Sequence, residues 1–322
     1  MTEPAAEFAF IARHFRPLAG PAALGLSDDA AVFLPPAGRE LVVCADAMVS
    51  GVHFLPTDPP DTVARKLLRV NLSDLAAMGA EPLGYLMTVS VPPDLPPDWF
   101  EGFGAGLAID QAGFGLSLLG GDTTSTAGPL VLSLTIIGHV APGTALRRNG
   151  ARAGDGVWVT GTIGDGALGL ACLTGGLTDR TGHLAGRYRL PQPRLGLKLA
   201  GVVHAAIDVS DGLVQDLGHL CRESGLAARI EAALVPASDA ARLAGPDWLE
   251  RRLTGGDDYE LLLAVPPVAQ AALLAAARAT GIPVTRIGVF EAGPHAVHVL
   301  APDGADLVFD RPGWSHFPDR PR

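Results

Sequence analysis

The sequence is poor in lysine. Only Lys66 and Lys198 occur among its 322 residues, so arginine carries almost all of the positive charge. Neither lysine follows a glycine-rich loop, and the GxxxxGK motif of P-loop nucleotide-binding proteins is therefore absent. The HRD and DFG motifs of protein kinases and the GxSxG turn of serine hydrolases are also missing. These absences exclude P-loop kinases, protein kinases and hydrolases built on that serine turn.

Cysteine is scarce too. Cys44, Cys172 and Cys221 lie far apart in the sequence and form no CxxC pair, so neither a zinc ribbon nor a disulfide framework is predicted. We expect them to be small core residues of a protein in a reducing compartment. No apolar run approaches the roughly 20 residues of a transmembrane helix, and the first residues do not follow the pattern of a signal peptide. The expected location is the cytoplasm.

Basic residues are outnumbered by acidic ones. The 34 aspartates and glutamates exceed the 24 lysines and arginines, which gives a formal net charge of −10 at pH 7. A negative chain of this kind does not favour nucleic acid or an anionic membrane as a partner. A 48% hydrophobic content over 322 residues is enough for a large core, and the length predicts about two domains. The best linker is 141–143, which places the domains at residues 1–142 and 143–322.

The stretch 61–79, DTVARKLLRVNLSDLAAMG, predicts the helix around which the first half is organised. Asp61 is the expected N-terminal cap and Gly79 the expected end. Asp74 falls in the middle of the apolar face, where an unpaired charge would be very costly. Hydrogen bonds to nearby backbone amides and a bound metal ion both explain it. The expected polar side consists of Thr62, Arg65, Lys66, Arg69 and Ser73.

Other acids of the first half adjoin short apolar runs. Asp29 belongs to an acidic turn before an expected strand at 30–34, and Asp46 follows an expected strand at 41–45. Asp122 lies in a glycine turn, where backbone amides could approach an anion. Acids at strand ends are where α/β enzymes often hold ligands, although local turn hydrogen bonds explain each one separately.

The second half repeats this pattern. Asp208, Ser210 and Asp211 crowd the start of an expected helix, and because one oxygen suffices for a helix cap, the surplus indicates ligand binding. Arg148 belongs to an arginine pair that could clamp a phosphate or form a solvated turn. The glycine-rich turn at 161–166 is similar to an anion site at a helix N-terminus, without the full GxGxxG spacing.

Six of these acids suggest a cation site. If they converge, their charges must be compensated. Oxygen ligands without a cysteine and histidine cluster favour Mg²⁺ or Ca²⁺ over Zn²⁺. Mg²⁺ is usually held by a few carboxylates together with substrate phosphates, which indicates nucleotide chemistry. The six are Asp29, Asp46, Asp74, Asp122, Asp208 and Asp211.

Seven motifs give the sequence a resemblance to the thiamine-monophosphate kinases, and it runs nearly end to end. They are SDDAAVF (27–33), ADAMVSGVHF (45–54), NLSDLAAMGAEP (71–82), GGDTT (120–124), IDVSDGL (207–213), GGDDYEL (255–261) and GWSHF (313–317). The SDLAAMGA, GGDTT and SDGL runs are shared with the wider superfamily of aminoimidazole ribonucleotide synthetase, selenophosphate synthetase and a hydrogenase maturation factor. The GVHF, GGDDYEL and GWSHF elements are typical of the thiamine branch.

This resemblance implies a two-domain α/β (α+β) fold. The N-terminal domain would be a mixed sheet with helices that binds ATP and magnesium and dimerises through a barrel-like interface, and the C-terminal domain would be α/β. The implied reaction converts ATP and thiamine monophosphate to ADP and thiamine diphosphate, with several Mg²⁺ ions. We expect direct in-line transfer without a general base, because the acceptor phosphate, with a second pKa of about 6, is already largely ionised.

The resemblance also implies roles for single residues. The expected magnesium ligands are Asp29, Asp46, Asp74, Asp122, Asp208 and Asp211. The expected ATP contacts are Gly121, Asp122, Arg148 and Ser210. The expected contacts to thiamine monophosphate are His53, Asp257 and Trp314.

The sequence departs from the family pattern at three places. Ser27 replaces a glycine, Cys44 and Ala45 replace hydroxyl residues, and Asp257 replaces a longer glutamate. None of these changes removes an expected carboxylate ligand, although a side-chain metal contact beside Asp46 is lost. Two alternatives stay open, namely another ATP-dependent reaction of the superfamily and a nucleotide-binding scaffold without turnover.

Overall fold

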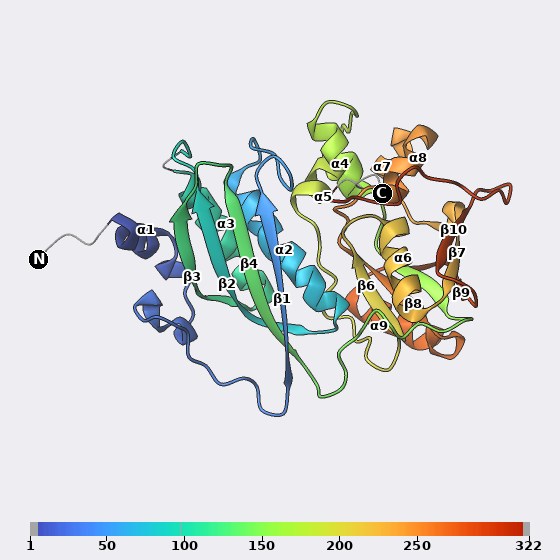
Figure 1. Ribbon diagram of the computed structural model, residues 1–322, viewed down its shortest axis with the longest axis horizontal. Helices are drawn as coiled ribbons and strands as arrows, with labels where there is room; N and C mark the ends of the chain where they lie inside the picture. The colour runs from blue at the N-terminus through green and yellow to red at the C-terminus, as the bar shows by residue number, and fades with distance from the viewer. Residues whose placement is uncertain (1–5, 97, 318–322) are drawn as a thin grey trace, which may run out of the picture. The chain divides into compact units, whose positions relative to one another are not determined.

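The computed structural model describes residues 6–96 and 98–317 (Figure 1). It divides into two compact units, one ending at Gly143 and the other starting at Thr144. The short segment Ala76–Gly79 belongs to the second unit, although the residues on both sides of it belong to the first. The boundary predicted between residues 142 and 143 would place this segment in the first unit.

The first unit contains a four-stranded mixed sheet in the order β1-β4-β2-β3. Its strands are β1 (Glu40–Val49), β2 (Glu81–Val91), β3 (Ser117–Ser125) and β4 (Val131–Val140). Strand β4 is antiparallel to β1 and β2, whereas β2 and β3 are parallel. The helices α2 (Pro60–Ala77) and α3 (Trp99–Phe114) lie along one face of this sheet (Figure 1).

The two faces of the sheet differ in burial. Along β4, Leu132, Leu134 and Ile136 are fully buried, while the residues between them are partly exposed. This alternation is typical of a strand covered on one side only. On the opposite face, Leu41 and Val43 of β1 expose 47% and 59% of their surface. The unit therefore has a helix-covered face and an open face that is partly apolar.

The N-terminal segment precedes this sheet. Helix α1 (Ala6–His14) is followed by the 3-10 turns η1 (Arg16–Leu18) and η2 (Pro21–Leu26). The strand expected at 30–34 does not form, so this prediction was wrong. Val32 donates its backbone N–H to Ala22 O at 2.9 Å, which ties the segment to η2, and its side chain is 70% exposed. An apolar run becomes a strand only where a neighbouring strand pairs with its backbone.

Helix α2 confirms the predicted helix but starts earlier. Pro60 is its first residue, so Asp61 lies inside the first turn and does not cap it as expected. Proline suits this position because its fixed φ is already helical and its missing N–H would have no helical partner. Gly79, with a φ of 71°, follows the helix end, as predicted for a left-handed C-terminal residue.

The expected polar side of α2 is not a solvated face. Lys66 is only 2% exposed and donates from Nζ to His53 O at 2.9 Å. Arg65 and Arg69 form ion pairs with the buried Asp110 of α3, at 3.0 and 2.6 Å. The basic side chains thus hold α2 against its neighbours. The helical periodicity shows which residues are polar, but it does not show that their partners are protein groups instead of water.

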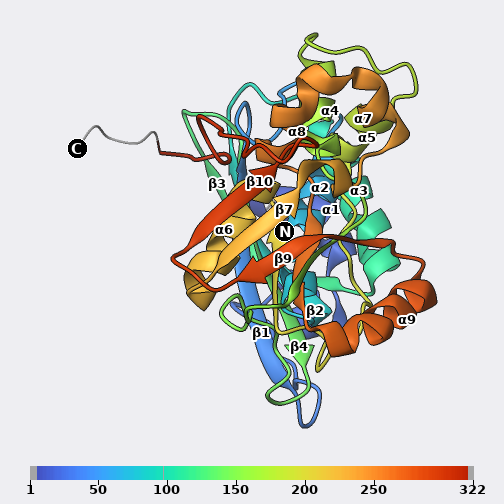
Figure 2. The same cartoon turned by 90° about the vertical axis from the view of Figure 1, so that its right-hand side faces the viewer.

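The second unit contains a six-stranded sheet in the order β10-β7-β9-β5-β8-β6. Its strands are β5 (Gly156–Thr160), β6 (Ala205–Val209), β7 (Ala227–Glu231), β8 (Glu260–Val265), β9 (Val284–Glu291) and β10 (Ala296–Leu300). Helices α6 (Leu213–Ser224) and α9 (Gln270–Thr280) lie on opposite sides of it (Figure 2). Strands β5, β6 and β8 are buried along their whole length, as expected for strands covered on both faces.

Four shorter helices complete the second unit. They are α4 (Asp165–Leu173), α5 (His183–Arg189), α7 (Asp239–Ala244) and α8 (Leu249–Thr254). Leu168, Leu184 and Ala241 form the centre of a small core between α4, α5 and α7. Three further 3-10 turns are η3 (Ala232–Leu234), η4 (Pro246–Trp248) and η5 (Pro267–Ala269). Among the residues described, no helix is long and apolar enough to cross a membrane.

Candidate functional site

The predicted site residues fall into two groups, one in each unit. The first unit holds Asp29, Asp46, His53, Asp74, Gly121 and Asp122. The second unit holds Arg148, Asp208, Ser210, Asp211, Asp257 and Trp314.

In the first unit, the buried Asn71 joins α2 to β1 beside Asp46. Its Nδ2 donates to Leu67 O at 2.9 Å, and its Oδ1 accepts the N–H of Asp46 at 3.1 Å. Cys44 Sγ lies 3.7 Å from Asn71 O, so the thiol that replaces a hydroxyl residue is used in the same contact. Asp74 lies one helical turn after Asn71 and on the same side. Asn71 thus links Asp46 of β1 to α2, the helix that also carries Asp74.

The glycine turn expected around Asp122 is part of strand β3, so this expectation was wrong. Gly121 pairs with Met87 of β2, and a Cβ at Gly121 would lie 1.8 Å from Met87 O, so no larger residue fits here. Asp122 pairs with Thr88 in the next row. Asp46 shares the row of Met87 through β4, so its side chain and that of Asp122 point to opposite faces.

Strand order separates these two acids further. Asp46 lies on the edge strand β1 and Asp122 on the other edge strand β3, with two strands between them. Strands about 4.8 Å apart put these positions roughly 14 Å from each other. Ligands of one Mg²⁺ ion lie about 2.1 Å from the metal, so these two carboxylates do not share an ion within this unit. Asp29, in the exposed turn after η2, belongs to neither row.

His53 follows β1 and is fixed on both sides. Its Nδ1 accepts the N–H of Val49 at 3.0 Å, and its carbonyl oxygen accepts from Lys66. Because Nδ1 is an acceptor, the neutral ring carries its proton on Nε2 and is oriented to donate from that atom.

The second unit brings three of the sequence motifs together. Asp257 donates its N–H to Ser210 O, and Trp314 donates its N–H to Asp211 O, both at 2.9 Å. Gln215 Nε2 donates to Asp211 Oδ2 at 3.1 Å and to Trp314 O at 2.7 Å. The segments 207–213, 255–261 and 313–317 are therefore in direct contact around the start of α6.

Asp216 holds the centre of this arrangement, and sequence reasoning missed it. Its Oδ2 accepts the backbone N–H groups of Ser210, Asp211 and Gly212 at 3.1, 3.0 and 3.1 Å. Burial and the neighbouring carboxylates of Asp208 and Asp211 raise the pKa of Asp216 well above its ordinary value, and the amide donors oppose that shift.

A histidine adds a possible ligand. The ligand atoms of Asp211, Asp216 and His219 lie within 4.8 Å of one another, which makes them a group that could hold a metal ion. Burial lowers the pKa of His219, and the positive charges of Arg222 and Arg148 lower it further. The charge of Arg148 therefore acts on His219, which lies beside the carboxylates of Asp211 and Asp216.

The glycine-rich turn at 161–166 does bind a carboxyl group, but that group belongs to this chain. The fully buried carboxylate of Asp258 accepts the N–H of Gly164 at 2.6 Å and that of Gly166 at 3.0 Å. Burial raises the pKa of Asp258 to about 8, against the effect of these two donors. The expectation of a ligand site at this turn is corrected, because a residue of the same chain already satisfies its amides.

The segment that contains Asp257 is sterically constrained. Asp257 and Tyr259 adopt positive φ values of 72° and 53°, which non-glycine residues rarely do. A Cβ at Gly256 would lie 2.2 Å from Ser210 O. Such strained backbone is commonly found at functional sites, where the surrounding structure holds it in place.

A buried ion-pair network holds Glu260, which follows this segment. Glu260 is fully buried and accepts from Arg187 at 2.9 Å, from Thr160 at 2.7 Å and from two nitrogens of Arg194. A buried carboxylate with two guanidinium partners fixes geometry because losing any one of them leaves a charge uncompensated.

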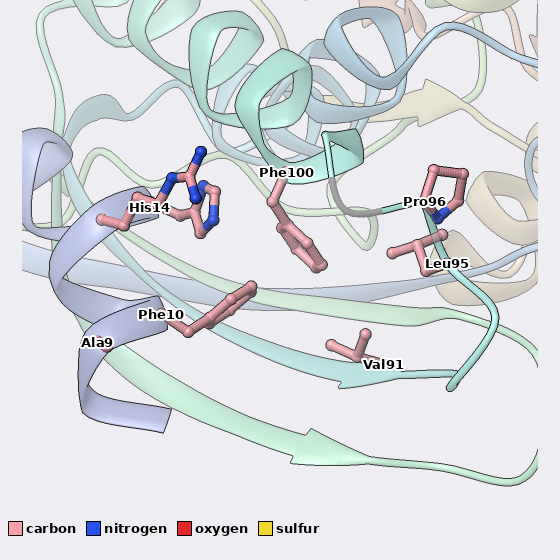
Figure 3. A pocket seen from close by; sticks show the side chains of 8 residues that line it. Ala9, Phe10, His14, Val91, Leu95, Pro96 and Phe100 are labelled. Atoms are coloured by element: carbon pink, nitrogen blue, oxygen red, sulfur yellow. The ribbon is translucent and has the colours of Figure 1, made fainter. Parts of the chain in front are cut away.

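A pocket of about 390 Å³ lies elsewhere in the first unit, between α1, the end of β2 and α3 (Figure 3). Phe10 and Phe100 meet edge to face there, with ring centroids 4.8 Å apart. Burial, followed by the charge of Arg13, lowers the pKa of His14 in its wall. Among the described residues that line it, none is a carboxylate and none is a predicted site residue.

Comparison with known proteins assigns the family. The family model described as AIR synthase related protein, N-terminal domain, matches residues 27–140, and the corresponding C-terminal domain matches 152–300. The thiamine-monophosphate kinase of Caulobacter vibrioides is 46% identical, over 97% of this chain and 91% of its own. The chain belongs to the thiamine-monophosphate kinase family.

Solved structures of this family agree with the fold. The thiamine-monophosphate kinase from Stenotrophomonas maltophilia K279a has a TM-score of 0.82 at 43% identity, and the match covers 93% of this chain and 97% of that one. AaThiL, solved in complex with AMPPCP and TMP, has a TM-score of 0.78 at 28% identity, with 98% and 100% covered. The two-domain α/β architecture implied by the motifs is confirmed for this thiamine-monophosphate kinase family member.

Several of these residues were given no role in the motif analysis. Asp216 had the signal that singled out Asp74, a lone carboxylate among the apolar positions of a helix. Asn71 and His219 gave only weak signals, since single polar residues are common in helices. Asp258 and Glu260 lay inside a recognised motif, but their partners are about 70 to 100 residues away in the sequence.

Proposed function

We propose that this chain catalyses the ATP-dependent phosphorylation of thiamine monophosphate to thiamine diphosphate. Membership of the thiamine-monophosphate kinase family supports the reaction, and a relative has been solved with AMPPCP and TMP. The observation that carries the proposal is the contact between the IDVSDGL, GGDDYEL and GWSHF segments around the start of α6. It joins residues proposed for nucleotide, metal and thiamine binding in one place.

The acidic residues suit magnesium. Carboxylate oxygens are the ligands that Mg²⁺ prefers in proteins, and Asp208 and Asp211 offer them beside Ser210. We assign the remaining magnesium contacts to Asp29, Asp46, Asp74 and Asp122, in line with the six-acid hypothesis. When bound, the ions would neutralise the charges of the two phosphate groups that react.

Other side chains would bind the two substrates. Arg148 supplies a guanidinium for the ATP phosphates, and Gly121 lets the backbone approach them closely. His53 is oriented to donate from Nε2 to the phosphate of thiamine monophosphate. Trp314 is 52% exposed, so its ring has a face on which a thiamine ring can stack. We assign Asp257 to the same substrate.

The mechanism is direct in-line transfer. The acceptor phosphate is largely ionised near neutral pH, so no side chain has to remove a proton from it. The work of the protein is to hold two anions in line and to compensate their charge, which can account for most of the rate acceleration in phosphoryl transfer. No phosphorylated form of the enzyme is required.

We also propose a homodimer formed through the first sheet. Its open face carries Leu41, Val43 and Leu86, which expose 47%, 59% and 40% of their surface. An uncovered apolar sheet face of this kind is typical of a protein interface. A second copy would cover this face.

The deciding experiment measures ADP release with ATP, Mg²⁺ and thiamine monophosphate, with free thiamine and an aminoimidazole precursor as alternative acceptors. We expect turnover with the monophosphate alone and thiamine diphosphate as the product. Turnover with the aminoimidazole precursor would move the assignment to another reaction of the superfamily. ATP binding without turnover on any acceptor would support the scaffold alternative and make Cys44, Ala45 and Asp257 the first residues to exchange.

A further inference from the structure

The carboxylate of Asp216 has an unusual set of partners. One oxygen accepts three successive backbone N–H groups, those of Ser210, Asp211 and Gly212, at 3.0 to 3.1 Å. The residue is 2% exposed, so water does not compete effectively for these bonds. The turn is therefore fastened to α6 through a single atom.

This contact determines which groups of the turn face outward. With its three N–H groups directed at Asp216, the turn presents its carbonyl oxygens elsewhere. Ser210 O accepts from Asp257, and Asp211 O accepts from Trp314. Removing the carboxylate would leave these three N–H groups without this acceptor.

We infer that Asp216 is a positioning residue that shapes the 208–212 turn for magnesium and nucleotide binding. The inference rests on the proposed function for the roles of Asp208, Ser210 and Asp211. The competing assignment is that Asp216 is itself a metal ligand, because one of its oxygens lies close to a carboxylate oxygen of Asp211 and a ring nitrogen of His219.

The first test measures backbone hydrogen exchange by mass spectrometry, without substrate or metal. In the wild type, the amides of the 208–213 segment should exchange slowly, and Asp216→Ala should make them exchange at least about tenfold faster. Asp216→Asn keeps one oxygen acceptor of the same shape and should restore part of the protection. This readout does not depend on turnover, so it also holds if the proposed reaction is wrong.

The second test measures the Mg²⁺ concentration for half-maximal activity and the KM for ATP. Loss of a residue that supports metal ligands typically costs about 10- to 100-fold in metal affinity or activity, and we expect this range for Asp216→Ala and a smaller change for Asp216→Asn. If Asp216→Ala does not fold, the asparagine variant still tests both quantities. Unchanged exchange, or equal kinetic losses in both variants, would overturn the positioning role.

A matched control is Asp155→Asn. Asp155 is 3% exposed and accepts from Arg152 N at 2.8 Å, with His204 Nδ1 at the same distance. It is a buried, hydrogen-bonded carboxylate of the same unit, but His204 precedes β6 while Asp208 lies near the other end of that strand. This variant should lose stability without altering exchange at 208–213 or the magnesium dependence.

Discussion

The two units hold their acids in different ways. In the second unit, Asp208 lies near the end of β6, and Asp211 lies on the turn that follows, whose backbone Asp216 binds by three hydrogen bonds. In the first unit, Asp46 and Asp122 lie on opposite edge strands of a four-stranded sheet. Local hydrogen bonds thus hold the acids of the second unit, whereas the sheet itself separates the acids of the first unit. Proximity of motifs in a fold therefore does not require that all their carboxylates share one ion.

The largest effect is expected from removing one acid of each unit, because this tests whether the acids of both units serve the reaction. We expect Asp74→Asn and Asp208→Asn each to lower kcat by more than about 100-fold, beyond the usual cost of losing a supporting residue. Both changes keep the size of the side chain, so the midpoint of thermal unfolding should stay near that of the wild type.

The control is Asp61→Asn, which lies on the same helix as Asp74 but in its first turn. It should keep nearly full activity. A near-normal rate in Asp74→Asn would remove this residue from the magnesium set, and a collapsed fold in Asp208→Asn would make its role structural.

The open face of the first sheet gives a second test. Val43→Asp places a charge among exposed apolar residues, and we expect it to weaken dimer formation at least about tenfold, which corresponds to about 1.4 kcal/mol. Sedimentation equilibrium measures the change. Val308 is 91% exposed in the second unit, and Val308→Asp serves as the control for added charge. A wild type that is monomeric at all concentrations would contradict the proposed dimer.

Two glycine substitutions compare a crowded and an open position of the first unit. Gly121→Ala forces a Cβ against Met87 O, and we expect a loss of about 1–3 kcal/mol in the free energy of unfolding, as for other overpacked sites. Gly113 lies in α3, and a Cβ there meets nothing within 4 Å. Gly113→Ala should therefore be neutral or stabilising by up to about 1 kcal/mol. Urea unfolding of both variants measures the contrast, and equal effects would contradict the tight β2–β3 contact.

The last prediction concerns pH and Asp258. Its pKa is about 8 in the folded protein, against an ordinary value of 3.8, so the folded state retains a proton that the unfolded state loses between these values. The associated stability is fully present below about pH 4 and declines as pH rises towards 8, by at most about 1.4 kcal/mol per pH unit. Asp258→Asn cannot titrate there. Parallel unfolding curves for wild type and variant from pH 5 to 8 would contradict the raised pKa.

Much of this architecture was predictable from local patterns. The helix around Asp74 and the buried strands of the second unit have clear periodicity or apolar runs. The segment 30–34 failed because its apolar residues were interpreted as a strand without a partner for its backbone. The glycine turn at 161–166 was recognised as an anion site, but a short-range pattern does not reveal that Asp258, more than 90 residues later, fills it. In both cases the outcome depended on partners that are distant in the sequence.

The motifs predicted a list of site residues and not their arrangement in space. Motifs identified Asp208, Ser210 and Asp211, because three oxygens at one helix start exceed what capping needs. They did not reveal that Asp216 orients the turn, since its partners are backbone N–H groups, which carry no sequence signal. Nor did they reveal the separation of Asp46 from Asp122, which follows from strand order and not from the spacing of motifs.

The lysine content has a practical consequence for studying this enzyme. Lys66 is only 2% exposed and engaged with His53, whereas Lys198 is exposed. Apart from the α-amino group, an amine-reactive dye would therefore attach mainly to Lys198, which belongs to the second unit. The wild-type chain can thus be labelled with a fluorescent reporter at Lys198, and no cysteine has to be introduced. Binding of nucleotide or thiamine phosphate could then be followed by optical titration.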